Sequence, residues 1–181
     1  SKPIALSEAQ GYGMLITVLA AKNHQANQGE FDKLLKYYQR HIISRKNHLM
    51  RWKQNEKNDS MVTSKNNKSN ATDGDMDIAY ALLQADELWG SAGSYNYHKI
   101  SMKIINDILT YNYNNTNRLL YLGDWAKNDQ RYQMLVRTSD LIPAYFGEFY
   151  KQTHDERWQI LYKMSVNTLS KLSQDSPVGL L

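Results

Sequence analysis

The chain has no cysteine and little proline or phenylalanine, with three of each among its 181 residues. Without cysteine it can form neither a disulfide nor a thiolate metal site, although many exported proteins also lack cysteine, so the compartment stays open. No apolar run approaches the roughly 20 residues that cross a bilayer, so no membrane span is expected. No basic and then apolar leader begins the chain, so we expect any export signal to have been removed or never to have existed.

Positive charge is concentrated in one polar segment. The net charge of the chain is +4, and residues 43–70 alone carry +5, from seven Lys or Arg against two acidic residues. A nucleic-acid interface needs a broader basic face, so a solvated loop is the favoured interpretation and no nucleic-acid partner is predicted. Thirteen Tyr and four Trp offer flat apolar faces with polar edges, which suit sugar rings, although a tyrosine-rich core explains the same composition.

Apolar residues recur at helical spacing in six segments, which predicts six helices. The first begins at residue 7, the second covers roughly 29–42, and the third begins at 72 and stops at Gly90; the others cover roughly 96–112, 139–152 and 155–173. The patterns Ser7-x-x-Gln10 and Thr72-x-x-Asp75 resemble capping boxes. Residues 43–71 and 113–136 lack periodicity and strand signals are weak, so the sequence predicts an all-α chain with two long loops.

Three acidic positions are predicted to converge at one end of the helices. Successive helical hairpins alternate in direction, so the first, third and fifth helices should start together, beside both long loops. Glu8 and Asp73 lie in the first turns of two of these helices, and Thr138-Ser139-Asp140 opens the third of them. The helix dipole favours acidic residues in first turns, so each position taken alone is explained without a functional site.

Glycines accompany the first two acidic positions. Gly11 and Gly13 cost about 1 kcal/mol each inside a helix relative to Ala, and Gly74 lies in the first turn of the third helix. Small residues there would let backbones or a ligand approach closely. They do not form a nucleotide-binding loop, because no Gly-Lys-Ser/Thr follows them and no strand precedes them.

Metal-dependent and serine-nucleophile chemistry find no support in the sequence. The run Asp73-x-Asp75-x-Asp77 superficially resembles a calcium loop, but Ile78 occupies the position of the required glycine and Gln84 that of the closing glutamate. The five histidines lack metal-ligand spacing, and no Gly-x-Ser-x-Gly elbow is present. We therefore predict no metal and no other cofactor.

Taken together, the segments of the chain resemble glycoside hydrolase family 8. The specific matches are Ser7-Glu8-Ala9-Gln10-Gly11-Tyr12-Gly13-Met14 and Ala71-Thr72-Asp73-Gly74-Asp75-Met76-Asp77-Ile78-Ala79-Tyr80-Ala81-Leu82-Leu83, followed by Ala85 and Trp89-Gly90. Weaker matches are Leu49-Met50-Arg51-Trp52-Lys53, Leu122-Gly123-Asp124-Trp125 and Arg137-Thr138-Ser139-Asp140-Leu141. They follow the family's order and cover nearly the whole chain.

The resemblance implies an (α/α)6 barrel of twelve helices, of which this chain supplies about the first six as three helical hairpins. Residues 1–181 would then be the N-terminal half of a single catalytic domain, with the C-terminal half absent from the chain. Half a barrel exposes the faces that its missing helices cover. We therefore expect residues 1–181 alone to aggregate or to fold only in part.

The resemblance also implies a role for individual residues. Glu8 would be the general acid of an inverting mechanism, and Asp73 would orient and distort the sugar at the cleavage point. In this family the catalytic base comes from the second half of the barrel, so the isolated chain should be inactive. Trp52 and Trp125 would stack on sugar rings, unless they only pin their loops to the helices. Candidates for contacts to sugar hydroxyls are Arg51, Asp124, Ser139 and Asp140.

The expected activity is endo-hydrolysis of β-1,4 bonds in a glucan, either cellulose or mixed-linkage β-glucan, by a secreted enzyme. A chitosanase of the same family is the first alternative. Chitosan is a polycation and prefers an acidic cleft, whereas residues 43–70 are basic. A catalytically inactive polysaccharide-binding fragment is the second alternative, and the presence of both Glu8 and Asp73 argues against it.

Overall fold

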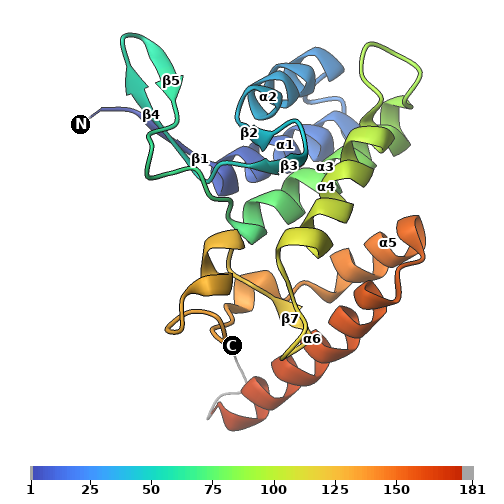
Figure 1. The fold of residues 1–181 in the computed structure, drawn as a ribbon. Helices are drawn as coiled ribbons and strands as arrows, with labels where there is room; N and C mark the ends of the chain where they lie inside the picture. The colour runs from blue at the N-terminus through green and yellow to red at the C-terminus, as the bar shows by residue number, and fades with distance from the viewer. Residues whose placement is uncertain (1, 177–181) are drawn as a thin grey trace. The chain divides into compact units, whose positions relative to one another are not determined.

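The computed structural model describes residues 2–176, which form two compact units that divide between Ile108 and Leu109 (Figure 1). Across the described residues there are six α-helices, at nearly the predicted positions. They are α1 (Ser7–Lys22), α2 (Gln28–Arg40), α3 (Thr72–Trp89), α4 (Tyr97–Tyr111), α5 (Pro143–Thr153) and α6 (Glu156–Asp175). The predicted fold class, an all-α chain that supplies about six helices of an (α/α)6 barrel, is confirmed.

The predicted loops are more regular than the sequence suggested. Four short strands lie mostly within residues 43–71, and two more lie within residues 113–136. The strands are β1 (Ile4–Leu6), β2 (Ile42–Ser44), β3 (Asn47–Met50), β4 (Lys53–Lys57), β5 (Ser60–Val62), β6 (Tyr113–Asn114) and β7 (Leu119–Leu120). They pair antiparallel in the order β1-β4-β5, β2-β3 and β6-β7. They interrupt the helices without changing the helical class of the fold.

The β4–β5 hairpin shows why the sequence pattern did not predict the strands. Asn58 and Asp59 at its tip both have left-handed φ angles, 51° and 56°, which suits a tight turn between twisted strands. The hairpin projects from the helices of the first unit (Figure 1), and its side chains are mostly polar. Alternation of apolar and polar residues, the usual strand signal, needs one buried face that this hairpin lacks.

Helices α1 and α3 lie side by side and run in the same direction within the first unit (Figure 1). At their starts the backbone of Gly74 lies against that of Glu8. Towards their ends the Lys22 ammonium donates to the Glu87 carboxylate at 3.2 Å. The prediction that the first and third helices are parallel is therefore confirmed.

The helix starts differ in detail from the prediction. Ser7 and Thr72 are already helical, the N-cap residues are Leu6 and Ala71, and neither helix has a side-chain cap. The two predicted capping boxes are therefore wrong. The Ser7 N–H instead donates to the carbonyl of Trp52 at 3.0 Å, so a distant segment satisfies the helix end. The fifth helix starts at Pro143 rather than at residue 139, because residues 138–140 form a separate 3₁₀ turn.

Apolar side chains are buried between helices in each unit. In the first unit Met14 and Val18 of α1 and Ile78 of α3 are fully buried. In the second unit the Trp158 ring of α6 packs on two rings of α5, with centroids 5.8 Å from Phe146 and 4.9 Å from Phe149. No helix among residues 2–176 is both long enough and apolar enough to span a membrane.

Candidate active site

Glu8 is the second residue of α1 and is partly exposed. Its Oε1 accepts a hydrogen bond from the hydroxyl of Tyr12, one helical turn later, at 3.2 Å. The Tyr12 side chain is about half exposed. The proposed acid therefore lies at the surface of the first unit with a hydroxyl donor beside it.

Asp73 occupies the equivalent place on α3, where it is the second helical residue and is 7% exposed. A Cβ on the next residue, Gly74, would lie 2.8 Å from the backbone nitrogen of Glu8, so the two helix starts touch. The pKa of the Tyr12 hydroxyl is raised, first by burial, next by its bond to Glu8, and then by the charges of Glu8, Asp77 and Asp73. The negative charges of three carboxylates therefore act on the Tyr12 hydroxyl, and Glu8 is bonded to it directly.

Two glycines make the contact between α1 and α3 possible. A Cβ on Gly11 would lie 2.6 Å from the Cβ of Asp77, and one on Gly74 would lie 2.6 Å from the backbone carbon of Ser7. Both distances are shorter than any real Cβ contact, so no larger residue fits at either position without displacing a helix. The close approach expected from these two glycines is confirmed. Gly13 differs, because a Cβ there would meet only Leu34 at 3.7 Å.

Trp52 lies between β3 and β4, beside the start of α1. Its carbonyl accepts from the Ser7 N–H, and its own N–H donates to the carbonyl of Ser69 at 2.8 Å. The residue is 36% exposed, and the Lys53 ammonium lies 5.6 Å from the centroid of its ring. Trp52 is thus partly exposed, and its backbone is bonded to the residue that precedes Glu8.

The Arg51 side chain has a structural partner. Its Nη2 donates to the carbonyl of Ile43 in β2 at 3.0 Å. Burial, followed by the charges of Arg51 and Arg40, lowers the pKa of His41. The guanidinium is therefore bound to the β2 backbone, and its contact with a sugar hydroxyl stays a prediction.

The other four candidate residues lie in the second unit. Trp125 is 41% exposed, and its ring meets that of Tyr132 edge-on, with centroids 5.2 Å apart. Asp124 precedes it at the start of a 3₁₀ turn, Asp124–Asn128. Asp140 is buried and bonded to the guanidinium of Arg137 at 3.1 Å, whereas Ser139 is exposed. Their roles in substrate binding remain predictions.

The sequence did not assign Tyr12 or Asp75 to the site. Tyr12 carries a recognisable signal, because it follows Glu8 by four residues on one helix face. Asp75 is fully buried and accepts hydrogen bonds from the Met50 N–H at 2.7 Å and the Asn70 amide at 2.8 Å. No spacing rule reveals that arrangement, since it joins a strand to a helix. Within residues 2–176, no cluster of three or more His, Asp or Glu is arranged to hold a metal ion.

Comparison with known proteins gives a consistent result over the whole chain. The family model for glycosyl hydrolases family 8 matches residues 1–181. A β-glucanase of Niallia circulans is 40% identical over 178 residues, which are 97% of this chain and 42% of that protein.

Solved structures agree with the sequence matches. The apo structure of a β-1,3-1,4-glucanase from Paenibacillus sp. X4 superposes with a TM-score of 0.83 at 39% identity, over 97% of this chain and 45% of that one. An endo-β-1,4-glucanase from an Achatina fulica gut metagenomic library gives a TM-score of 0.75 at 27% identity, over 93% and 50%. The chain therefore spans half or less of the length of these relatives. It belongs to glycosyl hydrolase family 8.

Proposed function

We propose that the protein is an endo-acting, inverting glycoside hydrolase that cleaves β-1,4 bonds of a glucan, with Glu8 as its general acid. One observation carries the proposal. Glu8 lies in the first turn of α1, in contact with the start of α3, where Asp73 lies, and the partly exposed Trp52 is bonded through its backbone to the residue before Glu8. A carboxyl group, a second carboxylate and an aromatic platform are the parts that glycoside hydrolysis needs on the acid side of the bond. The names of the relatives, β-glucanase and β-1,3-1,4-glucanase, support the substrate class.

In this mechanism the Glu8 carboxyl gives its proton to the glycosidic oxygen as the bond from that oxygen to the anomeric carbon breaks. Water attacks the anomeric carbon from the opposite face and loses its proton to a second carboxylate, so the configuration inverts. In inverting enzymes the two carboxyl groups are roughly 6.5–9.5 Å apart. We expect that base to come from the second half of the barrel, as the resemblance to the family implies.

Asp73 is proposed to hold the sugar at the cleavage point in a distorted conformation. Asp73 is almost fully buried at the start of α3, and the residue after it, Gly74, lies against the backbone of Glu8. A buried, fixed carboxylate is suited to bind a hydroxyl whose position changes towards the transition state. Trp52 and Trp125 are proposed as stacking platforms, and Arg51, Asp124, Ser139 and Asp140 as hydroxyl contacts.

We further propose that residues 1–181 are the first half of one (α/α)6 catalytic domain, and that the whole protein is secreted. Six helices in this chain fit half of a twelve-helix barrel. An enzyme that degrades an insoluble polymer must meet it outside the cell, which is the reason to expect export. Trp52 lies within residues 43–70, and the +5 charge of this segment should repel polycationic chitosan, which favours a neutral glucan.

The test uses the full-length protein with Glu8→Gln. This variant should lose hydrolysis while it still binds oligosaccharides, because the amide keeps the shape of the side chain but cannot supply a proton. Glu87→Gln, an exposed carboxylate at the far end of α3, is the matched control and should keep normal turnover. Reducing-sugar assays on carboxymethylcellulose, lichenan and chitosan decide the substrate. Near-normal turnover by Glu8→Gln would refute its role, and hydrolysis of chitosan alone would refute the glucan assignment.

A further inference from the structure

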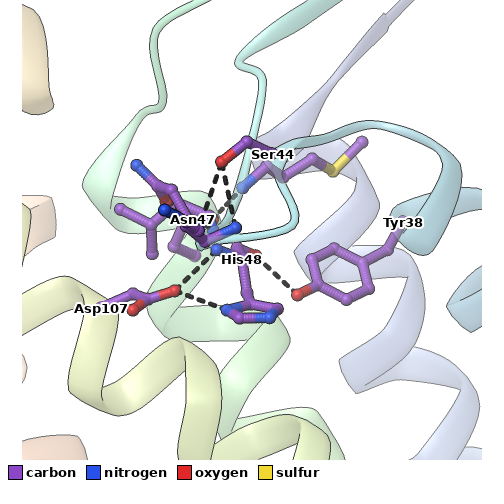
Figure 2. Close-up of polar contacts among 9 residues, drawn as sticks. Tyr38, Ser44, Asn47, His48 and Asp107 are labelled. Atoms are coloured by element: carbon purple, nitrogen blue, oxygen red, sulfur yellow. Dashed lines mark hydrogen bonds and ion pairs between the residues drawn. The ribbon is translucent and has the colours of Figure 1, made fainter.

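Two carboxylates on helices hold alternate N–H groups of β3. Asp107 of α4 accepts the backbone N–H of His48 at 2.6 Å and lies 2.8 Å from the Nδ1 of the same residue (Figure 2). Two residues later, Asp75 of α3 accepts the Met50 N–H at 2.7 Å. Since all four residues lie in the first unit, this strand is bound to two helices by buried or half-buried charges.

The partners of Asp75 differ from those of Asp107 in one respect. Asp75 Oδ1 accepts from the Met50 N–H, while its Oδ2 accepts from the Asn70 amide at 2.8 Å, and its side chain is fully buried. Both oxygens therefore face donors. In its contacts with His48, Asp107 uses Oδ2 alone.

The strand held by Asp75 leads directly to the proposed site. Arg51 pairs with Asn70 in an antiparallel bridge. The next residue, Trp52, accepts the Ser7 N–H through its carbonyl. Two hydrogen bonds and the backbone of residues 50–52 thus connect Asp75 to Ser7, the first residue of α1, which adjoins Glu8.

We propose that Asp75 is a positioning residue for the hydrolytic reaction, because it fixes residues 50–52 and so sets Trp52 against Glu8. The proposal rests on the proposed function. A carboxylate is required because an asparagine side chain in its place offers one acceptor and turns an NH₂ group towards a donor. A buried donor left without an acceptor is destabilising, and the strand would shift to relieve it.

The test exchanges the two side chains in the full-length protein. Asp75→Asn should reduce kcat/KM on a long oligosaccharide by about tenfold to a hundredfold, as expected for displacement of a site by about 1 Å. The double variant combines Asp75→Asn with Asn70→Asp. In it, the new amide side chain on α3 accepts the Met50 N–H through its oxygen and donates its NH₂ group to the new carboxylate. This variant should return to within about threefold of the wild type, because the bonds to the Met50 N–H and between residues 70 and 75 are both restored.

Two measurements separate positioning from a general loss of fold. Amide hydrogen exchange at Met50 and Ser7 should accelerate in Asp75→Asn and return to the wild-type rate in the double variant. Asp107→Asn is the matched control, because one oxygen suffices for its contacts with His48, and it should change kcat/KM by less than about threefold. If the wild type cleaves no glycan, the proposed function fails, while the exchange rates still test the connection from Asp75 to Ser7.

Three outcomes would overturn the proposal. One is an Asp75→Asn variant with the kcat/KM and exchange rates of the wild type. Another is a double variant that melts like the wild type but keeps the low kcat/KM, which would mean that the carboxylate acts otherwise than by position. The third is a double variant that regains neither its fold nor its activity. If Asp75→Asn alone fails to fold, the double variant must recover both properties.

Discussion

Gly11 and Gly13 provide a sharp test of the contact between α1 and α3. They lie two residues apart on one helix, so Gly→Ala at either position gives a similar gain in helix propensity, about 1 kcal/mol. Their surroundings differ. A Cβ at Gly11 would lie 2.6 Å from the Asp77 Cβ and 3.1 Å from the Gly74 carbonyl oxygen, whereas one at Gly13 would lie 3.7 Å from Leu34.

The magnitude follows from these distances. Carbon atoms pack at about 3.5–4.0 Å, so Gly11→Ala must move α1 and α3 apart by roughly 1 Å. Overpacking of this kind costs about 1–3 kcal/mol. Because the propensity gain is common to both variants, Gly11→Ala should be less stable than Gly13→Ala by about 1–3 kcal/mol. Separation of the helix starts that carry Glu8 and Asp73 should also lower kcat by about a hundredfold.

The assay compares both variants with the wild type in the full-length protein. Urea unfolding followed by circular dichroism gives the free energy of unfolding, and reducing-sugar release from lichenan gives kcat. Gly13→Ala should be slightly more stable than the wild type and fully active. Equal stability and equal activity of the two alanine variants would refute the argument that α1 and α3 touch through Gly11.

Three further predictions concern other parts of the chain. The pKa of Tyr97 is raised to about 12 by burial and by the bond that its hydroxyl donates to Asp32. The unfolded chain loses this proton near pH 10, so the stability that the hydroxyl contributes is complete below pH 10 and is lost as pH rises to about 12. Between pH 10 and 12 the unfolding free energy of the wild type, measured by urea titration, should fall by roughly 2–3 kcal/mol more than that of Tyr97→Phe. Equal falls would contradict the raised pKa of Tyr97. Trp52→Ala and Trp125→Ala should each weaken binding of long oligosaccharides more than short ones in calorimetry, and a loss independent of chain length would indicate rings that only pin their loops. A polypeptide of residues 1–181 alone should aggregate or melt without a cooperative transition in calorimetry, and a sharp monomeric melt would disprove this.

The helices were predictable because their signals are local. Apolar residues three and four positions apart share a helix face, so the pattern around Met14 and Val18, or Ile78 and Leu82, needs no knowledge of the partner helix. The strand pairs were not predictable in the same way. Residues 53–62 are mostly polar, and their pairing with β1 joins positions about fifty residues apart.

The site was predictable as a set of residues but not as a geometry. The motifs around Glu8 and Asp73 identified the family, which the comparisons confirm. The capping boxes failed because Trp52, far along the chain, supplies the acceptor for the Ser7 N–H. A local sequence pattern cannot show that a distant carbonyl accepts the N–H group at the helix start in place of a side-chain cap.

By itself the sequence determined the six helices, the family and the two acidic helix starts, because these depend on residue types at short, fixed spacings. Only the tertiary structure decided how closely the helix starts approach, since Gly11 and Gly74 matter through atoms of another helix. It alone showed that Asp75 accepts hydrogen bonds from the nearby Asn70 amide and from the Met50 N–H of a distant strand. Close packing and buried hydrogen bonds depend on positions in space, and the order of residues fixes those positions only through the whole fold.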